Sequence, residues 1–379
     1  MKRFVHVITP GDHFSPLTGS AIPTVVHGLS VGSPQASPRP AVAVAKGTYP
    51  ERYTSADIIE YAPASPHGYD RYLDAALSRF RLPRASARRN FSAVLVGQRG
   101  WESSVVLAHN APQLITVVDT DRHVPVLYAH NHILRTYTRR ESARVLAAAP
   151  VVVTVSNSLA DQLAKHMPPS HRDRLRVVRN GVDVETFKPR ASPGRTESLE
   201  VFFIGRMIRD KGPDVLIEAL LRLGRRDIRL TIVGASDFDP RAALTAYERN
   251  LRSAAAPLGD RVRFRPFLPR AAVAEQLRQA DVVVVPSRWP DPCPLTVMEG
   301  MAAGAAVVGS DIGGIPESLR GTGLIVPPDE PSALAAALEA LADDEAYRMG
   351  VAAACRDFAE RHDWTWAAQR LDEVLSPLR

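Results

Sequence analysis

The sequence contains few cysteines, and it has no apolar run long enough to cross a membrane. Cys293 and Cys355 are the two cysteines in 379 residues, which is too few for a disulfide framework and is typical of a reducing compartment. The longest apolar runs have the length of a strand, and the first ten residues become polar too early for a signal peptide. We therefore expect a cytoplasmic protein whose stability does not depend on disulfides.

Two common phosphate-binding motifs are also missing. Neither G-x-G-x-x-G nor G-x-x-x-x-G-K-[ST] occurs, which removes the main support for a dinucleotide-binding or P-loop protein. Only five residues are lysine, so arginine supplies most of the positive charge behind a net charge of +6. This balance favours anionic ligands without selecting nucleic acid, and we expect no nucleic-acid partner. The strongest arginine cluster is interpreted as a solvated face, with a membrane surface or an acidic acceptor as the less favoured alternative: Arg79, Arg81, Arg84, Arg88 and Arg89.

Length and composition indicate a globular protein with more than one domain. A chain of 379 residues is too long for one ordinary core, and 45% hydrophobic with 23% charged residues is typical of folded proteins. Apolar runs without clean alternation predict parallel strands that are buried on both faces. Helix-length segments separate these runs, which predicts two Rossmann-like, doubly wound α/β domains with a ligand in the cleft between them. The predicted strands cover residues 4–8, 41–45, 105–108, 124–129, 151–156, 201–205, 229–234, 281–286, 305–310 and 323–328.

A change in composition near residue 190 predicts where one domain ends. Residues 188–200 are polar and contain Pro and Gly, as is typical of a linker. The predicted divisions are residues 1–190, residues 191–355 and a C-terminal helical segment over residues 356–379. We expect this last segment to pack back towards the first domain, with Trp364 and Trp366 as packing residues.

Three stretches of the chain resemble motifs of the retaining glycosyltransferases of family 4, which have the GT-B fold. Residues 202–220, FFIGRMIRDKGPDVLIEAL, resemble the G-R-x4-K-G stretch of that family. Residues 281–317, DVVVVPSRWPDPCPLTVMEGMAAGAAVVGSDIGGIPE, resemble its E-x7-E stretch and the Gly-Gly-x-x-E turn that follows. Residues 177–187, VVRNGVDVETF, resemble its N-G-V-D-x-x-x-F segment. The order and spacing of the three agree over residues 100–370, whereas the first hundred residues match only loosely.

The resemblance implies an acceptor-binding first domain and a nucleotide-sugar-binding second domain. It implies transfer of a hexose or N-acetylhexosamine, with retention, from a nucleotide diphosphate sugar to a hydroxyl, without a metal or another cofactor. We favour a UDP-linked donor over a GDP-linked one. A soluble small acceptor of the antibiotic-biosynthesis type is favoured slightly over a glycan or a lipid carrier. The alternatives are a catalytically inactive sugar-nucleotide-binding protein, a GT-B epimerase and a cyclitol-coupling enzyme. A monomer or a homodimer is expected.

Two cations in the second half are suited to hold a diphosphate. Arg206 follows a predicted strand at the carboxyl edge of the sheet, and Lys211 lies where a helix with Pro213 in its first turn begins. Both charges can meet one diphosphate, together with the N–H groups of the helix start. They would stabilise the negative charge that grows on the leaving phosphate. The alternative is a surface ion pair with Asp210 or Asp214.

Two acids flank a stiff corner in the sequence PDPCPLTVMEG. Asp291 precedes the two prolines, and Glu299 lies eight residues later. Because proline disfavours helix at the preceding residue, the helix is expected to start near Leu295, with Pro294 before it. The N–H groups of Leu295 and Thr296 can then bind phosphate oxygens.

By resemblance, Glu299 binds the ribose and Asp291 fills the position of the acid that contacts the sugar. Asp replaces the usual Glu at position 291, and Cys-Pro replaces the more usual Phe-Gly, so the identity of the sugar stays open. A cap on the following helix is the alternative for Asp291, and a plain surface acid is the alternative for Glu299.

The remaining candidates come mainly from the resemblance. Gly234 and Phe267 lie where family members contact the base, largely through the backbone. His130 ends a predicted strand and is placed near the transferred sugar, with His132 on the same face; ordinary packing and a zinc pair are the alternatives. Gly19 and Ser20 resemble the Gly-rich first loop, where the backbone approaches donor or acceptor closely, and a plain turn is the alternative.

Overall fold

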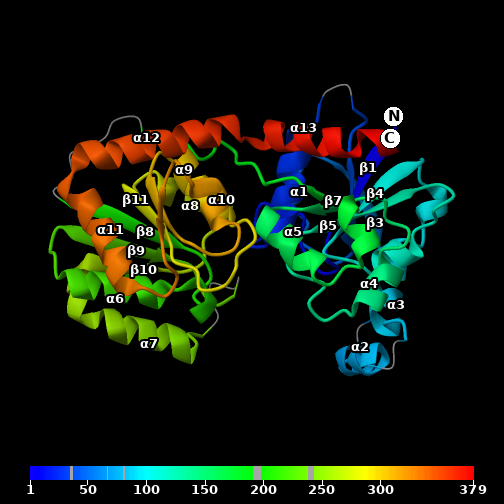
Figure 1. Cartoon of the computed structure of the whole chain (residues 1–379), viewed down its shortest axis with the longest axis horizontal. Helices are drawn as coiled ribbons and strands as arrows, with labels where there is room; N and C mark the ends of the chain where they lie inside the picture. Colours follow the sequence, from blue (N-terminus) through cyan, green and yellow to red (C-terminus); the bar gives the residue numbers. More distant parts are fainter. Residues whose placement is uncertain (35–36, 66, 80–81, 191–197, 238–242) are drawn as a thin grey trace. The chain divides into compact units, whose positions relative to one another are not determined.

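The computed structural model describes residues 1–34, 37–65, 67–79, 82–190, 198–237 and 243–379. The chain divides into two compact units (Figure 1), and the second unit interrupts the first. Unit 1 contains Met1–Asn180 and Trp364–Arg379, and unit 2 contains Gly181–Asp363. Arg81 of the arginine cluster and residues 191–197 of the predicted linker lie outside the described residues. None of the described helices is long and apolar enough to span a membrane.

Unit 1 is built on a parallel sheet whose inner strands are buried on both faces. In the described residues the sheet has seven strands in the order β3-β2-β1-β4-β5-β6-β7. Every residue of β2 and β4 is buried, which explains why these strands read as continuous apolar runs. The strands are β1 (Arg3–Val7), β2 (Ala41–Ala45), β3 (Asp57–Tyr61), β4 (Ser104–His109), β5 (Val124–Ala129), β6 (Val152–Thr154) and β7 (Leu175–Val177).

Helices cover this sheet between the strands, and a last helix returns to it from the C-terminus. The α-helices are α1 (Ala21–Val31), α2 (Asp70–Arg79), α3 (Ala85–Val94), α4 (Arg139–Val145), α5 (Asn157–Ala164) and α13 (Trp364–Leu375). Short 3₁₀ turns are η1 (Gln98–Gly100), η2 (Leu114–Val117), η3 (Pro169–Arg174) and η6 (Ser376–Leu378). Helix α13 packs on α1, where a Cβ atom at Gly28 would lie 2.1 Å from the ring of Trp364. Trp364 is therefore a packing residue, as the sequence predicts.

Unit 2 repeats the same architecture. In the described residues its parallel sheet has six strands in the order β10-β9-β8-β11-β12-β13. The strands are β8 (Leu199–Ile204), β9 (Ile228–Val233), β10 (Val262–Arg265), β11 (Val282–Val285), β12 (Ala306–Ser310) and β13 (Leu324–Val326). The helices are η4 (Arg209–Lys211), α6 (Pro213–Leu223), α7 (Ala246–Ala255), η5 (Ala256–Arg261), α8 (Arg270–Leu277), α9 (Leu295–Ala302), α10 (Ile315–Leu319), α11 (Pro331–Asp343) and α12 (Glu345–Arg361).

The divisions between the units differ from the predicted ones at residues 190 and 355. Residues 181–190 belong to unit 2, because Val182 and Phe187 are buried in its core. Residues 356–363 also belong to unit 2, because α12 continues to Arg361 and buries Ala359 in the same core. The segment predicted over residues 356–379 is thus the end of one helix and the whole of another.

The arginine cluster is partly neutralised by neighbouring side chains. Arg84 donates to Glu141 over 2.8 Å and stacks on the ring of Tyr137. Arg89 donates to Asp70 over 2.7 Å. Two members of the predicted solvated face, Arg84 and Arg89, are therefore held in ion pairs.

Candidate functional site

The loops that carry the predicted residues of unit 2 meet where the strand order reverses. Strand β8 is first along the chain, and it lies between β9 and β11. In an open parallel sheet, ligands bind at the carboxyl ends of the strands beside such a switch point. The loop after β11 is tied to the loop after β8, because the N–H of Arg288 donates to the carbonyl of Asp210 over 2.9 Å.

An ion pair joins these two loops. The ammonium of Lys211, after β8, contacts the carboxylate of Asp291, after β11. Asp291 is buried, with 8% of its surface exposed. The predicted alternative for Lys211, a pair with Asp210 or Asp214, is therefore wrong; Asp214 pairs with Arg288 over 2.7 Å instead.

Glycines allow the backbone to come this close. Gly212 has φ +69°, and a Cβ atom there would lie 2.0 Å from the carbonyl oxygen of Pro286. Gly313 has φ +63°, and a Cβ atom there would lie 2.4 Å from the carbonyl oxygen of Asp291. The N–H of Gly314 donates to that same oxygen over 2.8 Å. The Gly-Gly turn therefore contacts the backbone of Asp291 and fixes its position.

Helix α9 begins at Leu295, as the prolines predict. Its N-cap is Pro294, and no side chain caps it, so the alternative role of Asp291 as a helix cap is wrong. The first-turn residues Leu295 and Thr296 are only partly buried, and Thr296 Oγ1 donates to the carbonyl of Ile204 over 3.4 Å. These contacts place the start of α9 beside the end of β8.

Glu299 lies one turn further along α9, and only 5% of its surface is exposed. The plain-surface alternative is therefore wrong. A carboxylate of Glu299 lies 2.6 Å from the guanidinium of Arg270, the first residue of α8. Arg270 in turn lies over the ring of buried Phe187. Sequence reasoning missed Arg270, since nothing in the sequence shows that the start of α8 reaches α9.

The other predicted residues of unit 2 lie at the same carboxyl edge. Gly234 follows β9 with φ +141°, and a Cβ atom there would lie 1.9 Å from the carbonyl oxygen of Gly205. Phe267 follows β10 and is partly buried. Arg206 follows β8 and is exposed, and no ion pair is recorded for it among the described residues. The structure thus brings Lys211 and Asp291 into contact, whereas Arg206 stays available to a ligand.

In unit 1, His130 follows β5 and is held from both sides. The backbone N–H of His130 donates to Asn110 Oδ1 over 2.7 Å, and Asn110 has φ +53°. Its Nε2 is hydrogen-bonded to Nδ1 of His109 over 2.8 Å. His132 does not share this arrangement, because its ring packs edge-on against His166. In the described part of the chain, no group of three or more His, Cys, Asp or Glu side chains is arranged to hold a metal.

The loop after β1 carries a partly buried acid that sequence reasoning missed. Ser20 is the N-cap of α1 and, like Gly19, is only partly buried. The side chain of Ser20 hydrogen-bonds to Asp12, and burial raises the pKa of Asp12. Burial and the charge of Asp12 raise the pKa of Tyr61, at the end of β3, to about 12. The loop therefore presents hydrogen-bonding side chains at the ligand edge of unit 1.

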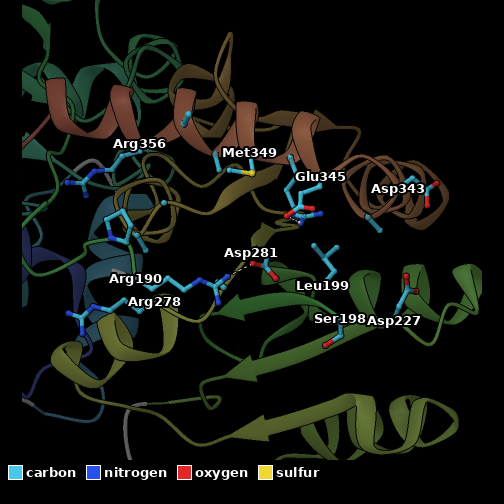
Figure 2. Close-up of a pocket in the computed structure, with 18 residues that line it drawn as sticks. Arg190, Ser198, Leu199, Asp227, Arg278, Asp281, Asp343, Glu345, Met349 and Arg356 are labelled. Atoms are coloured by element: carbon cyan, nitrogen blue, oxygen red, sulfur yellow. Dashed lines mark hydrogen bonds and ion pairs between the residues drawn. The ribbon is translucent and has the colours of Figure 1, made fainter. Parts of the chain in front are cut away.

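A separate cavity of about 610 Å³ lies at the opposite, amino-terminal edge of the sheet of unit 2 (Figure 2). It contains none of the predicted site residues. Its walls include Leu199, which begins β8, and Asp281, which precedes β11. The guanidinium of Arg190 points at Asp281 and lies 2.6 Å from it, so this charge is already paired. The cavity is not part of the predicted site.

Comparison with known proteins follows the same division of the chain. A family model described as "Glycosyltransferase Family 4" matches residues 5–186, and one described as "Glycosyl transferases group 1" matches residues 198–344. A D-inositol 3-phosphate glycosyltransferase of Corynebacterium glutamicum (strain R) is 30% identical over 304 residues, which are 74% of this chain and 70% of that protein.

The chain belongs to the group 1 glycosyltransferases of family 4. A D-inositol 3-phosphate glycosyltransferase of Streptomyces avermitilis is 34% identical over 249 residues, which are 62% of this chain but only 53% of that relative. Anabaena HepE, solved in complex with UDP and glucose, has a TM-score of 0.75 at 18% identity, covering 99% of this chain and 100% of that one. This likeness confirms the predicted fold, two Rossmann-like domains of the GT-B type.

Proposed function

We propose that this family 4 member is a retaining glycosyltransferase that moves a hexose or N-acetylhexosamine from a UDP-linked donor to a hydroxyl of a small acceptor. The observation that carries the proposal is the contact between Lys211 and Asp291 at the switch point of unit 2. In a nucleotide diphosphate sugar the sugar is bonded directly to a phosphate. A cation for that phosphate and an acid for that sugar should therefore be neighbours, as these two are.

The second acid supports the nucleotide end of the proposal. Glu299 lies one helical turn, about 6 Å, beyond the first turn of α9, whose free N–H groups suit phosphate oxygens. A buried carboxylate at that distance is placed to accept hydrogen bonds from the two ribose hydroxyls. The guanidinium of Arg270, 2.6 Å away, holds this carboxylate in position before the nucleotide arrives. The base would then lie towards Gly234 and Phe267, which follow the neighbouring strands β9 and β10.

The transfer step needs charge stabilisation more than a nucleophile. The bond between the anomeric carbon and the phosphate oxygen breaks, and the acceptor oxygen bonds to the same face of that carbon. The proton of the acceptor hydroxyl passes to the leaving diphosphate. Lys211 and Arg206 stabilise the charge that grows on the diphosphate, a contribution of roughly 3–4 kcal/mol for one such contact. His130 is the candidate in unit 1 for contact with the sugar.

We propose a small polyol as the acceptor, bound by unit 1. Two of the compared relatives are named for D-inositol 3-phosphate, a ring of hydroxyls with a phosphate. Asp12 and Ser20 offer a carboxylate and a hydroxyl to such a ring. A membrane surface at the arginine cluster stays the less favoured partner.

A donor screen with matched variants tests the proposal. UDP release is measured with UDP-glucose, UDP-N-acetylglucosamine and GDP-mannose, with myo-inositol and its phosphates as acceptors. We expect Glu299→Ala to weaken UDP binding, Asp291→Ala to lower kcat mainly, and Glu339→Ala, an exposed acid on α11, to change neither. Parent-like binding and turnover in both site variants would refute the assignment.

Two further readouts separate the proposal from its rivals. NMR of the product shows whether the anomeric configuration of the donor is retained. Isothermal titration with UDP shows binding independently of turnover. Tight binding of UDP without transfer to any acceptor would favour a sugar-nucleotide-binding protein over an enzyme.

A further inference from the structure

Three histidines form a diagonal row on one face of the sheet of unit 1. His6 is level with Leu107 in the register of β1 and β4, and His109 is level with Tyr128 in the register of β4 and β5. Each step from His6 to His109 to His130 therefore moves one strand across and two residues towards the carboxyl edge. Because side chains alternate between faces with a period of two, all three imidazoles share one face.

Hydrogen bonds join the three rings into a continuous chain. His6 Nδ1 lies 2.9 Å from His109 Nε2, and His109 Nδ1 lies 2.8 Å from His130 Nε2. The exposed fractions are 1%, 0% and 9% along the row, so the chain runs from the interior to the edge of the sheet. Tyr128 stacks on both His109 and His130, with ring centroids 5.0 and 4.6 Å apart. This packing leaves the rings little freedom to turn.

The chain consists of neutral imidazoles at neutral pH. Burial, as the largest cause, lowers the pKa of His6 and of His130 to about 3 and that of His109 well below its usual value. A neutral imidazole has one N–H donor and one bare nitrogen acceptor. The two hydrogen bonds must therefore point the same way, and the N–H groups all face either the interior or the edge.

The ends of the chain decide between these two directions. The two directions place the terminal N–H on different nitrogens, on His6 Nε2 in the inward direction and on His130 Nδ1 in the outward direction. His6 is only 1% exposed, whereas His130, at the edge of the sheet, is 9% exposed. A terminal N–H is less costly at the more exposed end of the row, where water or a ligand oxygen can accept from it. The outward direction is therefore favoured, and it leaves an N–H on His130 Nδ1.

We propose that His6 and His109 are positioning residues that hold His130 as a neutral ring with its proton on Nδ1, donated to an oxygen of a ligand bound at the carboxyl edge of unit 1. The inference rests on the proposed function, since it assigns a role to His130 in the transfer. A neutral imidazole can donate a hydrogen bond to a sugar or phosphate oxygen without placing a second positive charge beside an oxocarbenium-like centre. It also has a consequence that does not depend on catalysis, because the position of the proton can be read in the resting protein.

The test is the NMR spectrum of protein carrying ¹⁵N-labelled histidine, without substrate. The chain has 11 histidines, so the resonances of His130 are assigned by their loss in His130→Gln. We expect a protonated Nδ1 and an unprotonated Nε2 at His130, unchanged between pH 6 and pH 8. His109→Leu removes the N–H group that donates to His130 Nε2. We then expect the two nitrogens of His130 to show mixed protonation. A parent protein with the proton on Nε2, or a His109→Leu variant with an unchanged pattern, overturns the proposal.

Matched variants separate positioning from folding. In His109→Asn the side-chain amide can replace Nδ1 as a donor, so it should restore the pattern of His130 that His109→Leu loses. His123→Asn removes another buried imidazole of unit 1, which is hydrogen-bonded to the carbonyl of Gln98, and should leave His130 unchanged. If His109→Leu does not fold, His6→Leu tests the same chain from its inner end.

Kinetics then connect the row to the reaction. We expect His109→Leu to lower kcat roughly tenfold, the effect of one lost hydrogen bond, with little change in the KM for the donor. His109→Asn should recover most of that loss. If the parent transfers no sugar but shows the expected proton on Nδ1 of His130, the proposed function is wrong and the proposed positioning of His130 by the row is supported. If the parent transfers sugar but carries the proton on Nε2 of His130, the proposed positioning is wrong and the proposed function is supported.

Discussion

The buried histidine row makes the stability of unit 1 sensitive to mild acid. The folded state keeps all three rings neutral, because burial lowers their pKa values far below 6.5. The unfolded chain exposes them, and each then binds a proton with a pKa of about 6.5. Since the unfolded state binds more protons, the free energy of unfolding falls as the pH falls below 6.5.

The size of this loss follows from the pKa difference. Lowering the pH from 7 to 5 favours the unfolded state by about 2 kcal/mol for each neutral imidazole, or about 6 kcal/mol for the three. That is comparable to the whole free energy of unfolding of a typical domain. Unit 1 should therefore be close to unfolding at pH 5, although its predominantly apolar core is unchanged.

Urea unfolding followed by tryptophan fluorescence measures this loss. Trp101, Trp364 and Trp366 belong to unit 1, so the signal mainly follows that unit. In His109→Leu only two imidazoles of the row remain, and the contribution of the row to the loss between pH 7 and pH 5 should shrink to about 4 kcal/mol. Other groups that titrate contribute equally to parent and variant. An equal loss in both proteins would refute the reasoning, because the row would then be protonated in the folded state.

Three further predictions concern the other contacts described above. Arg270→Ala leaves the buried carboxylate of Glu299 without its cation and its positioning contact, so the KM for the sugar donor should increase roughly tenfold, measured by UDP release. Gly212→Ala forces a Cβ atom against the backbone of Pro286 and should lower the urea midpoint of unit 2 clearly, whereas Gly224→Ala, with φ +63° and open space around its Cβ, should cost only about 1–2 kcal/mol. Trp364→Ala removes the ring that fills the space over Gly28 and should destabilise unit 1 by about 3–5 kcal/mol, measured by thermal unfolding; an unchanged midpoint would show that α13 does not stabilise unit 1.

Most strands could be predicted from the sequence because they are buried on both faces. The predicted strands over residues 41–45 and 124–129 coincide with β2 and β5, and the other predicted strands overlap the observed ones within a few residues. Among the strands of the described residues, the sequence analysis missed β3, β7 and β10. In β10, arginines alternate with apolar residues, because this strand lies at the edge of its sheet and is only partly covered. Helix α12 was also missed, which placed the second predicted boundary inside it.

The candidate site divides in a similar way. Arg206, Lys211, Asp291 and Glu299 were named as candidates from the sequence, since each follows a strand or a proline corner that is visible there. Their partners were not found. Lys211 and Asp291 are 80 residues apart in the chain, and Arg270 reaches Glu299 from another helix.

By itself, the sequence determined the class of fold and the kinds of side chain at the carboxyl edges of the sheets, because apolar periodicity and turn residues act locally. Only the tertiary structure decided which side chains meet. Strand order brings distant loops together, and no local pattern encodes that order. The histidine row shows the difference most clearly: its three members lie at positions 6, 109 and 130, and they become one chain of hydrogen bonds only because β1, β4 and β5 are neighbours in the sheet.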